Sequence, residues 1–206
     1  MANTDIAIGR LLSSSVSAFV AGCRVHEEEI PEFGTLVKVG LGDKLTIYGI
    51  IFDISIVDDG VVRQLATAEN VHPAAIADNR TNRNVPMEMS IASLGYKREE
   101  ISHLLPPRPA LSLDVISLCS DEEVVEFTDK GFGYLRHLLQ NPDLPAGEVI
   151  AAHVRQVDAV QRAAGNSQWS RAAAQELIVQ LRDDYPVLMN VLGALGEVGL
   201  VAEGND

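Results

Sequence analysis

The residue types that most often do chemistry are sparse in this chain, and their spacing completes no metal site. Cys23 and His26 have half the spacing of a zinc site, but no second Cys-x-x-Cys or His-x-x-x-His pair accompanies them. The acidic run from Asp121 to Glu123 lacks the spaced oxygen ligands and the glycine of a calcium loop. We therefore predict no bound metal, and we interpret this acidic run as a charged turn.

Patterns for catalysis and for nucleotide binding are missing as well. The chain contains no Gly-x-x-x-x-Gly-Lys-Ser/Thr phosphate loop, and its five histidines show no arrangement with Ser or Cys that is typical of a nucleophile. We predict a protein that is not an enzyme and binds no cofactor. One enzymatic alternative stays open, a hydrolase that uses His72 or His103 with a carboxylate where a long segment crosses the mouth of a barrel.

Basic residues gather in one part of the sequence. The formal net charge is −13, so the chain lacks the broad positive field on which non-specific nucleic-acid binding depends. Arg80 and Arg83 lie in an Asn-rich segment, and Arg108 follows further along. If this region folds so that the three guanidinium groups converge, they can bind a carboxylate or phosphate of a partner. These arginines are the predicted partner-binding residues, and the simpler interpretation is solvated loop charge.

The elements that must position these residues change type near residue 128. Up to that point, short runs of β-branched and aromatic residues alternate with Gly, Pro, Asn and Asp, which is typical of strands and turns. Gly49 within a long run predicts the bend that a sheet needs to close. Residues 1–128 are therefore predicted to form a closed antiparallel β-barrel of about six strands. The predicted strands are Ala7–Leu12, Ala18–Val25, Leu36–Gly40, Lys44–Ile56, Ser112–Leu118 and Val124–Phe127.

A long insertion and a helical tail complete the predicted α+β fold. Residues 66–109 are predicted to form an irregular excursion between two strands, with a short helix at Tyr96–Leu105. After residue 128 the apolar period becomes about 3.6, which predicts a small helical domain over 129–206. Its predicted helices are 131–139, 145–163 and 169–182, with Ser167 as the N-cap of the third, and a fourth that Asp184 and Pro186 open.

Several segments resemble a known barrel family in both order and spacing. Ile8-Gly9-Arg10 with the strand around Phe19, then Phe33 to Val39, then Tyr48 to Ile54, resemble the HAS barrel. This six-stranded barrel stands at the N-termini of HerA-type DNA translocases and, in related form, of ATP synthase subunits. Leu105–Pro109 is similar to the return segment of the same family. The resemblance covers about residues 6–128, and an SH3-like or OB-type barrel is the competing interpretation.

The tail carries a second, weaker resemblance. Residues 170–201 resemble the second and third helices of a winged helix and the strand that follows them. The stretch in the position of the recognition helix, residues 187–198, contains no Lys or Arg, so it is poorly suited to phosphate contacts. A partner-binding or packed helical bundle is the preferred interpretation.

The HAS resemblance implies a role in assembly. In that family the barrel precedes an ATPase domain and helps subunits to assemble, whereas this chain lacks the ATPase motif. We expect a non-enzymatic module that oligomerises or binds a protein partner such as an ATPase. The alternative is an accessory factor in DNA processing that binds nucleic acid weakly through the Arg80 to Arg108 region or the tail. Because no apolar stretch approaches the roughly 20 residues of a membrane span and the N-terminus lacks a secretory pattern, we expect a cytoplasmic protein.

Overall fold

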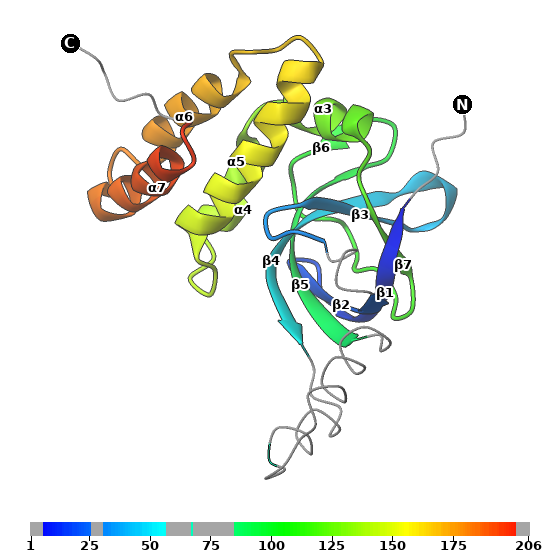
Figure 1. The fold of residues 1–206 in the computed structure, drawn as a ribbon. Coiled ribbons are helices and arrows are strands. Elements are labelled where there is room, and N and C mark those ends of the chain that lie inside the picture. Colours follow the sequence, from blue (N-terminus) through cyan, green and yellow to red (C-terminus); the bar gives the residue numbers. More distant parts are fainter. Residues whose placement is uncertain (1–5, 26–30, 57–66, 68–84, 201–206) are drawn as a thin grey trace, which may run out of the picture.

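Six antiparallel strands form a closed barrel in the first part of the chain, as predicted (Figure 1). The structure is a computed structural model and describes residues 6–25, 31–56, 67 and 85–200. Around the barrel the order is β2, β1, β7, β3, β4 and β5, and pairing of β5 with β2 closes the ring. These strands are β1 (Ala7–Ser14), β2 (Ala18–Val25), β3 (Leu36–Gly40), β4 (Thr46–Ile56), β5 (Val85–Lys97) and β7 (Val115–Leu118); a short β6 (Ile101–Ser102) pairs with β5.

The predicted bend at Gly49 is confirmed. The register between β4 and β5 shifts between Tyr48 and Gly49, and again between Ile51 and Asp53. A Cβ atom on Gly49 would lie 2.5 Å from Ile91 Cγ2, so no larger residue fits where the sheet folds over. Local chain chemistry thus provides the curvature that lets a six-stranded sheet close.

The prediction of irregular structure was wrong for residues 85–102, because they form the long strand β5, a turn and the short strand β6. Strand β5 pairs with β2 along its first half and with β4 along most of its length. Met87, Met89 and Ile91 point inward and alternate with partly exposed residues, which is the two-residue period of a strand. The predicted helix over Tyr96–Leu105 is instead the end of β5, a turn and β6.

The predicted strand at Val124–Phe127 was also wrong, because these residues belong to helix α3 (Asp121–Asp129). Ser120 Oγ accepts a hydrogen bond from Glu123 N, and the Glu123 carboxylate accepts one from Ser120 N. This reciprocal capping box starts a helix and outweighs the strand preference of the two valines. The acidic run that was interpreted as a turn is the first turn of α3.

The helical tail is confirmed over the described residues. It contains η3 (Gly133–Leu135), α4 (Arg136–Leu139), α5 (Ala146–Ala163), α6 (Trp169–Gln180) and α7 (Tyr185–Glu197). Asp184 caps α7 by accepting from Val187 N, as its position predicted, but Ser167 does not cap α6, where Gln168 takes the N-cap position without a side-chain bond. Residues 198–200 form a turn. None of the described helices is both long and apolar enough for a membrane crossing.

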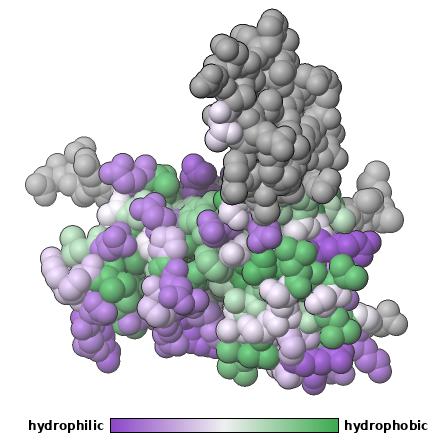
Figure 2. Space-filling view, turned by 90° about the horizontal axis from the view of Figure 1, so that it is seen from below, coloured by the Kyte–Doolittle hydropathy of each residue, from purple (hydrophilic) through white to green (hydrophobic). Residues whose placement is uncertain are grey.

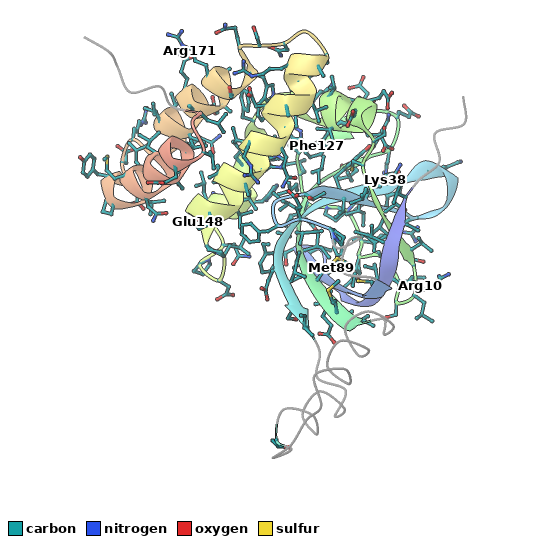
Figure 3. All side chains as sticks on the ribbon, viewed as in Figure 1. Arg10, Lys38, Met89, Phe127, Glu148 and Arg171 are labelled. Atoms are coloured by element: carbon teal, nitrogen blue, oxygen red, sulfur yellow. The ribbon has the colours of Figure 1, made fainter. Side chains whose placement is uncertain are left out.

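The buried apolar residues form two clusters. The first, which we call the barrel interior, includes Leu11, Val37, Ile51, Met89 and Ile116. The second, the barrel–helix core, lies between the outer face of the barrel and the helices, and it includes Tyr48 and Leu94 from the barrel with Phe127, Val154 and Leu177 from the helices. Figure 3 shows Met89 within the barrel and Phe127 at the boundary with the helices. The helices therefore share a core with the barrel.

Candidate functional site

A short segment, residues 110–114, runs along β1 and is fixed to it by hydrogen bonds. Leu113 N donates to Leu11 O at 2.8 Å, and Leu11 N donates to Asp114 O at 3.0 Å. The Arg10 guanidinium donates to Leu113 O at 2.9 Å. The predicted strand Ser112–Leu118 includes the last three residues of this segment, but β7 begins only at Val115. The segment is an ordered turn that precedes β7 and continues its pairing with β1.

Side chains fix both ends of this turn. Ser14 Oγ donates to Ala110 O at 2.7 Å, and Asp114 Oδ2 accepts from Leu111 N at 2.8 Å. Ser112 Oγ donates to Leu12 O at 3.3 Å. These hydrogen bonds fix the backbone of the turn, and the side chains of Leu111 and Leu113 are exposed on it.

Leu113 has an unusual backbone conformation. Its φ is +74°, the left-handed region, which no other non-glycine residue adopts within the described parts of the chain. This conformation costs a leucine on the order of 1 kcal/mol, because its Cβ crowds the following carbonyl. Its side chain is nevertheless 66% exposed and therefore gains little from burial in this chain. Strain of this kind is typical of functional surfaces.

Four apolar side chains are exposed together with this turn. Leu111 and Leu113 project from it, Val115 begins β7, and Leu12 lies on β1 against Gly22, where a Cβ atom would come within 3.2 Å of Leu12 Cδ1. Arg10 pairs with Val115 across the two strands, so both side chains point outward. We call the surface of Arg10, Leu12, Leu111, Leu113 and Val115 the β1–β7 face.

The β1–β7 face lies on the barrel, away from the helices. Arg10 marks its position on the side of the barrel opposite α5, α6 and α7 (Figure 3). In the view from below, hydrophobic residues are exposed at several places on this side of the molecule (Figure 2). The face is therefore not covered by the helices of its own chain.

A hollow of about 460 Å³ adjoins this face, because Val115 lines both. Lys38 Nζ donates to Glu123 Oε1 at 2.5 Å within it, and both side chains are largely buried. Ser117 lies opposite Lys38 across the β3–β7 pairing. Lys38, Ser117 and Glu123 therefore line the same hollow.

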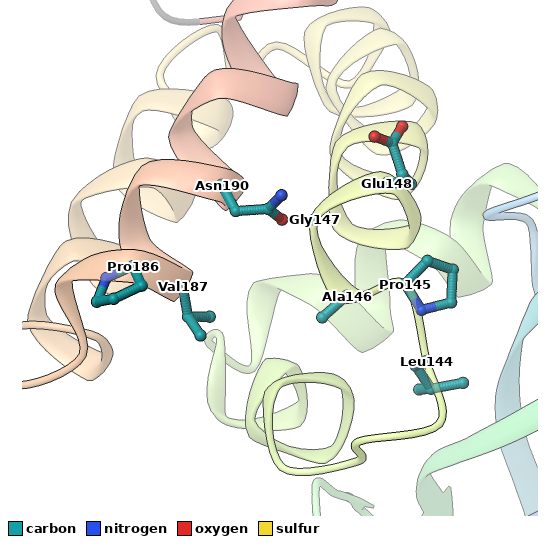
Figure 4. A pocket seen from close by; sticks show the side chains of 8 residues that line it. All are labelled: Leu144, Pro145, Ala146, Gly147, Glu148, Pro186, Val187 and Asn190. Atoms are coloured by element: carbon teal, nitrogen blue, oxygen red, sulfur yellow. The ribbon is translucent and has the colours of Figure 1, made fainter.

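A second hollow of about 400 Å³ lies between the first turns of α5 and α7 (Figure 4). Leu144, Pro145 and Val187 give it a mostly apolar lining, and the Asn190 side chain points toward Gly147 across it. Glu148 points away from Asn190. This hollow brings together no pair of groups that could exchange a proton.

Buried polar groups join the loop before β3 to α5. His153 Nδ1 bonds to Gly34 O at 3.2 Å, and its Nε2 bonds to the Tyr134 hydroxyl at 3.1 Å. A carbonyl can only accept, so Nδ1 carries the proton and Nε2 accepts from the tyrosine. Burial lowers the pKa of His153 to about 4, so the ring is neutral at pH 7. The pair is a satisfied structural contact.

Gly34 allows this contact to form. Its φ is +85°, and a Cβ atom there would lie 2.7 Å from Ala152 Cβ. The residues on either side of Gly34 also bond to α5. Gln156 Nε2 donates to Phe33 O at 2.9 Å, and Gln156 Oε1 accepts from Thr35 Oγ1 at 3.1 Å. A glycine is required here because the loop backbone touches the helix directly.

The remaining described histidines are also structural. His103 donates from Nε2 to Phe127 O at 3.0 Å, and its own carbonyl accepts from His137 and from the Arg136 guanidinium. Burial lowers the pKa of both His103 and His137. Within the described residues no hydrogen bond joins His103 to a carboxylate, and His72 lies outside them. The hydrolase alternative gains no support from His103.

The three arginines of the predicted partner-binding site are not brought together in the part that can be described. Arg80 and Arg83 lie outside the described residues, and so does His26 of the half zinc motif. Arg108 is exposed, two residues before Ala110. Across the described ranges, no group of three or more His, Cys, Asp or Glu could hold a metal ion. Sequence reasoning missed the β1–β7 face, since exposed leucines give no periodic signal.

No protein-family model matches this chain, and no curated protein matches it. The closed barrel is a property of the structure, and its resemblance to the HAS barrel stays a prediction.

Proposed function

We propose that this protein is a non-enzymatic assembly module that contacts another protein subunit through the β1–β7 face. The observation that carries the proposal is Leu113, an exposed leucine held in a left-handed backbone conformation by hydrogen bonds from Arg10 and to Leu11. Neither burial within the chain nor backbone preference favours leucine at this position. An apolar contact from outside the chain does.

The charges favour a second copy of the chain as the partner that contacts the β1–β7 face. The face carries the cation Arg10 among apolar side chains, while the whole chain has a net charge of −13. Two identical faces in contact would bring two Arg10 guanidinium groups together, whereas the acidic remainder of another copy offers carboxylates. We therefore propose a head-to-tail contact, in which the β1–β7 face of one copy binds a different surface of the next. Repeated contacts of this kind form a closed ring when the rotation between neighbouring copies brings the last copy back to the first.

The HAS resemblance supports the same role. Barrels of that family help subunits to assemble beside an ATPase, so an ATPase is the alternative partner for the same face. The cytoplasm is the compartment that we propose, in keeping with two cysteines that are not joined in a disulfide.

Replacement of Leu113 by Asn separates assembly from folding. Asn tolerates the left-handed region, so Leu113→Asn should leave the barrel folded while it removes the apolar side chain. The matched control is Met189→Gln, which changes a half-exposed apolar residue on α7. We expect Leu113→Asn to weaken self-association about tenfold or more, and Met189→Gln to leave it unchanged.

Size-exclusion chromatography with multi-angle light scattering measures this effect on the full chain. We expect a defined oligomer from about 0.1 to about 0.5 M NaCl, because apolar contacts are not screened by salt. A wild-type protein that is strictly monomeric at all concentrations, or an oligomer that Leu113→Asn leaves intact, contradicts self-assembly through this face. A monomer that joins a purified ATPase only with Leu113 present identifies the alternative partner.

A further inference from the structure

A hollow of about 450 Å³ lies along one side of α6, far from the β1–β7 face in the sequence and on a different element. Its polar end is lined by Arg162 from α5 and by Ser167, Ser170 and Arg171 around the start of α6. Its other end is lined by Ala174, Ile178 and Leu200. The hollow thus joins a polar, basic end to an apolar wall.

The first turn of α6 presents backbone donors without a cap. Gln168 stands at the N-cap position, and its side chain makes no capping hydrogen bond. The first backbone bond of the helix runs from Ala172 N to Gln168 O at 3.0 Å, so the preceding amides have no acceptor within the helix. Free amides and the helix dipole together favour a negative charge at this end.

Ser170 supplies an independent observation at the same place. Its side chain is 5% exposed and lines the hollow. Within the part of the chain that the structure describes, its hydroxyl makes no hydrogen bond. The hydroxyl is not among the buried side-chain atoms that lack a partner, so it is reachable from the hollow and is free to donate a hydrogen bond to a bound group.

The charged side chains that line the hollow are two arginines, Arg162 and Arg171. Arg162 bonds to Asp158 Oδ2 through Nε at 2.6 Å, which leaves its two terminal nitrogens for another acceptor. Arg171 stands at the exposed end of α6 (Figure 3) and makes no ion pair with another described residue. No carboxylate lines this hollow, although the chain has 29 acidic and 16 basic residues.

We propose that this hollow binds a small organic phosphate. The phosphate group accepts hydrogen bonds from the first turn of α6, from the Ser170 hydroxyl and from the two guanidinium groups, which suit its oxygens. The body of the ligand is apolar or aromatic and packs against Ala174, Ile178 and Leu200. A volume of about 450 Å³ falls within the range of small-molecule pockets.

Phenyl phosphate is a suitable probe because it joins a phosphate to an apolar ring. Titration into the ¹⁵N-labelled full chain, followed by heteronuclear NMR at neutral pH, should shift the Ser170 and Arg171 amide resonances in a saturable way. We expect a dissociation constant on the order of 1 mM, as a ligand of this size allows. Inorganic phosphate should bind more weakly, and phenol should leave both amides unshifted.

Two variants test the assigned residues, and a third serves as control. Ser170→Ala and Arg171→Gln should each weaken phenyl phosphate binding about fivefold to tenfold. Ser170→Ala should not lower the melting temperature, because the hydroxyl has no partner to lose, and this separates a binding role from a structural one. Arg155→Gln, an exposed arginine of α5 outside the hollow, should bind like wild type.

Two results would overturn the proposal. One is the absence of saturable shifts at Ser170 and Arg171 with phenyl phosphate at up to about 20 mM, well above the expected dissociation constant. The other is equal binding by wild type, Ser170→Ala and Arg171→Gln. Self-assembly through the β1–β7 face uses none of these residues, so the two proposals fail independently.

Discussion

The barrel interior and the barrel–helix core are both buried, but they are held together in different ways. The barrel interior is built mainly from apolar residues, with Ser93 as a buried polar exception, and the closed ladder of strands satisfies its backbone. The barrel–helix core adds histidine, tyrosine and glutamine side chains with specific partners, such as His153 between Tyr134 and Gly34. Burial closes the barrel, whereas directional hydrogen bonds fix how the helices dock on it.

The two regions also differ in how completely their polar atoms are paired. Among the buried side-chain atoms described, Asp158 Oδ1, Gln161 Oε1 and Trp169 Nε1 on the helices lack a hydrogen-bond partner, against Ser93 Oγ alone in the barrel strands. Unpaired buried groups cost free energy. The following experiments compare how much each region contributes to the stability of the folded chain.

Truncation of a large apolar residue should have the largest effect in either region. Phe127→Ala should lower the free energy of unfolding by about 4 kcal/mol, because its ring contacts Tyr48, His103 and Tyr134, and Ile91→Ala in the barrel interior by about 3 kcal/mol. Urea unfolding followed by circular dichroism and by fluorescence of the single tryptophan, Trp169, measures both.

These two probes also test whether the regions unfold together. Trp169 lies in the barrel–helix core, so its fluorescence follows the helices, while circular dichroism follows the whole chain. Because the clusters share one folded body, we expect the two transitions to coincide in both variants. An Ile91→Ala variant whose tryptophan transition stays at the wild-type urea concentration would show that the barrel unfolds separately.

Acid should weaken the barrel–helix core selectively. His153 is neutral in the folded protein, with its pKa lowered by burial from 6.5 to about 4, so below pH 6.5 the unfolded chain binds a proton that the folded chain does not. Stability from this group is therefore complete above pH 6.5 and falls as the pH drops toward 4, by about 3 kcal/mol in total. The lowered pKa values of His103 and His137 act in the same direction.

Urea unfolding at pH 7.5, 6.0 and 5.0 checks this dependence, since the first value lies above the pKa of the unfolded histidine and the other two lie between the unfolded and folded values. His153→Gln should unfold with a shallower pH dependence than wild type, whereas Ile91→Ala should keep the wild-type slope. If the free energy of unfolding falls equally with pH in wild type and His153→Gln, His153 is not the group that causes the loss of stability in acid.

Loss of the Tyr134 hydroxyl tests the same contact without a change of charge. Tyr134→Phe leaves His153 Nε2 buried without its donor, which should cost about 2 kcal/mol. A conservative control is Tyr96→Phe, which changes a partly exposed tyrosine of β5. A loss of equal size in both variants would contradict the role assigned to the buried pair.

The smallest effect is expected at Gln156. Gln156→Leu removes the hydrogen bonds to Phe33 O and from Thr35 Oγ1, but these groups are partly accessible to water, so we expect a loss of about 1 kcal/mol. Thermal unfolding measures it, with Gln175→Leu on α6 as an exposed control. A Gln156→Leu variant as stable as wild type would indicate that apolar packing alone docks the loop on α5.

The sequence predicted the barrel and most helices because those features depend on local patterns. Gly49 marked the bend in β4, and Asp184 marked the start of α7. The prediction failed where short-range signals competed: the valines of α3 resembled a strand, and the Ser120–Glu123 capping box decided otherwise. Strand β5 was missed because its residues follow a long polar segment, although Met87, Met89 and Ile91 alternate clearly.

The candidate sites were beyond sequence reasoning for a different reason. The β1–β7 face forms because residues 110–114 fold back against β1, a contact between segments about a hundred residues apart that no local pattern reports. The hollow on α6 depends on a missing cap and on Leu200 reaching the helix from beyond α7. Arg80 and Arg83, which the sequence singled out, lie outside the described residues.

Closure of the barrel through β1 and β7 has a consequence during synthesis on the ribosome. Ala7 of β1 pairs with Ser117, and Ala18 of β2 pairs with Ala92. The hairpin of β1 and β2 can therefore complete its pairing only after β5 and β7 have been synthesised. At translation rates of about 5–20 residues per second, β1 stays without its second neighbour for several seconds at least. An unpaired strand edge of this kind can join other nascent chains. Chaperone dependence in the cell would then concern the N-terminal hairpin more than the late, locally folding helices.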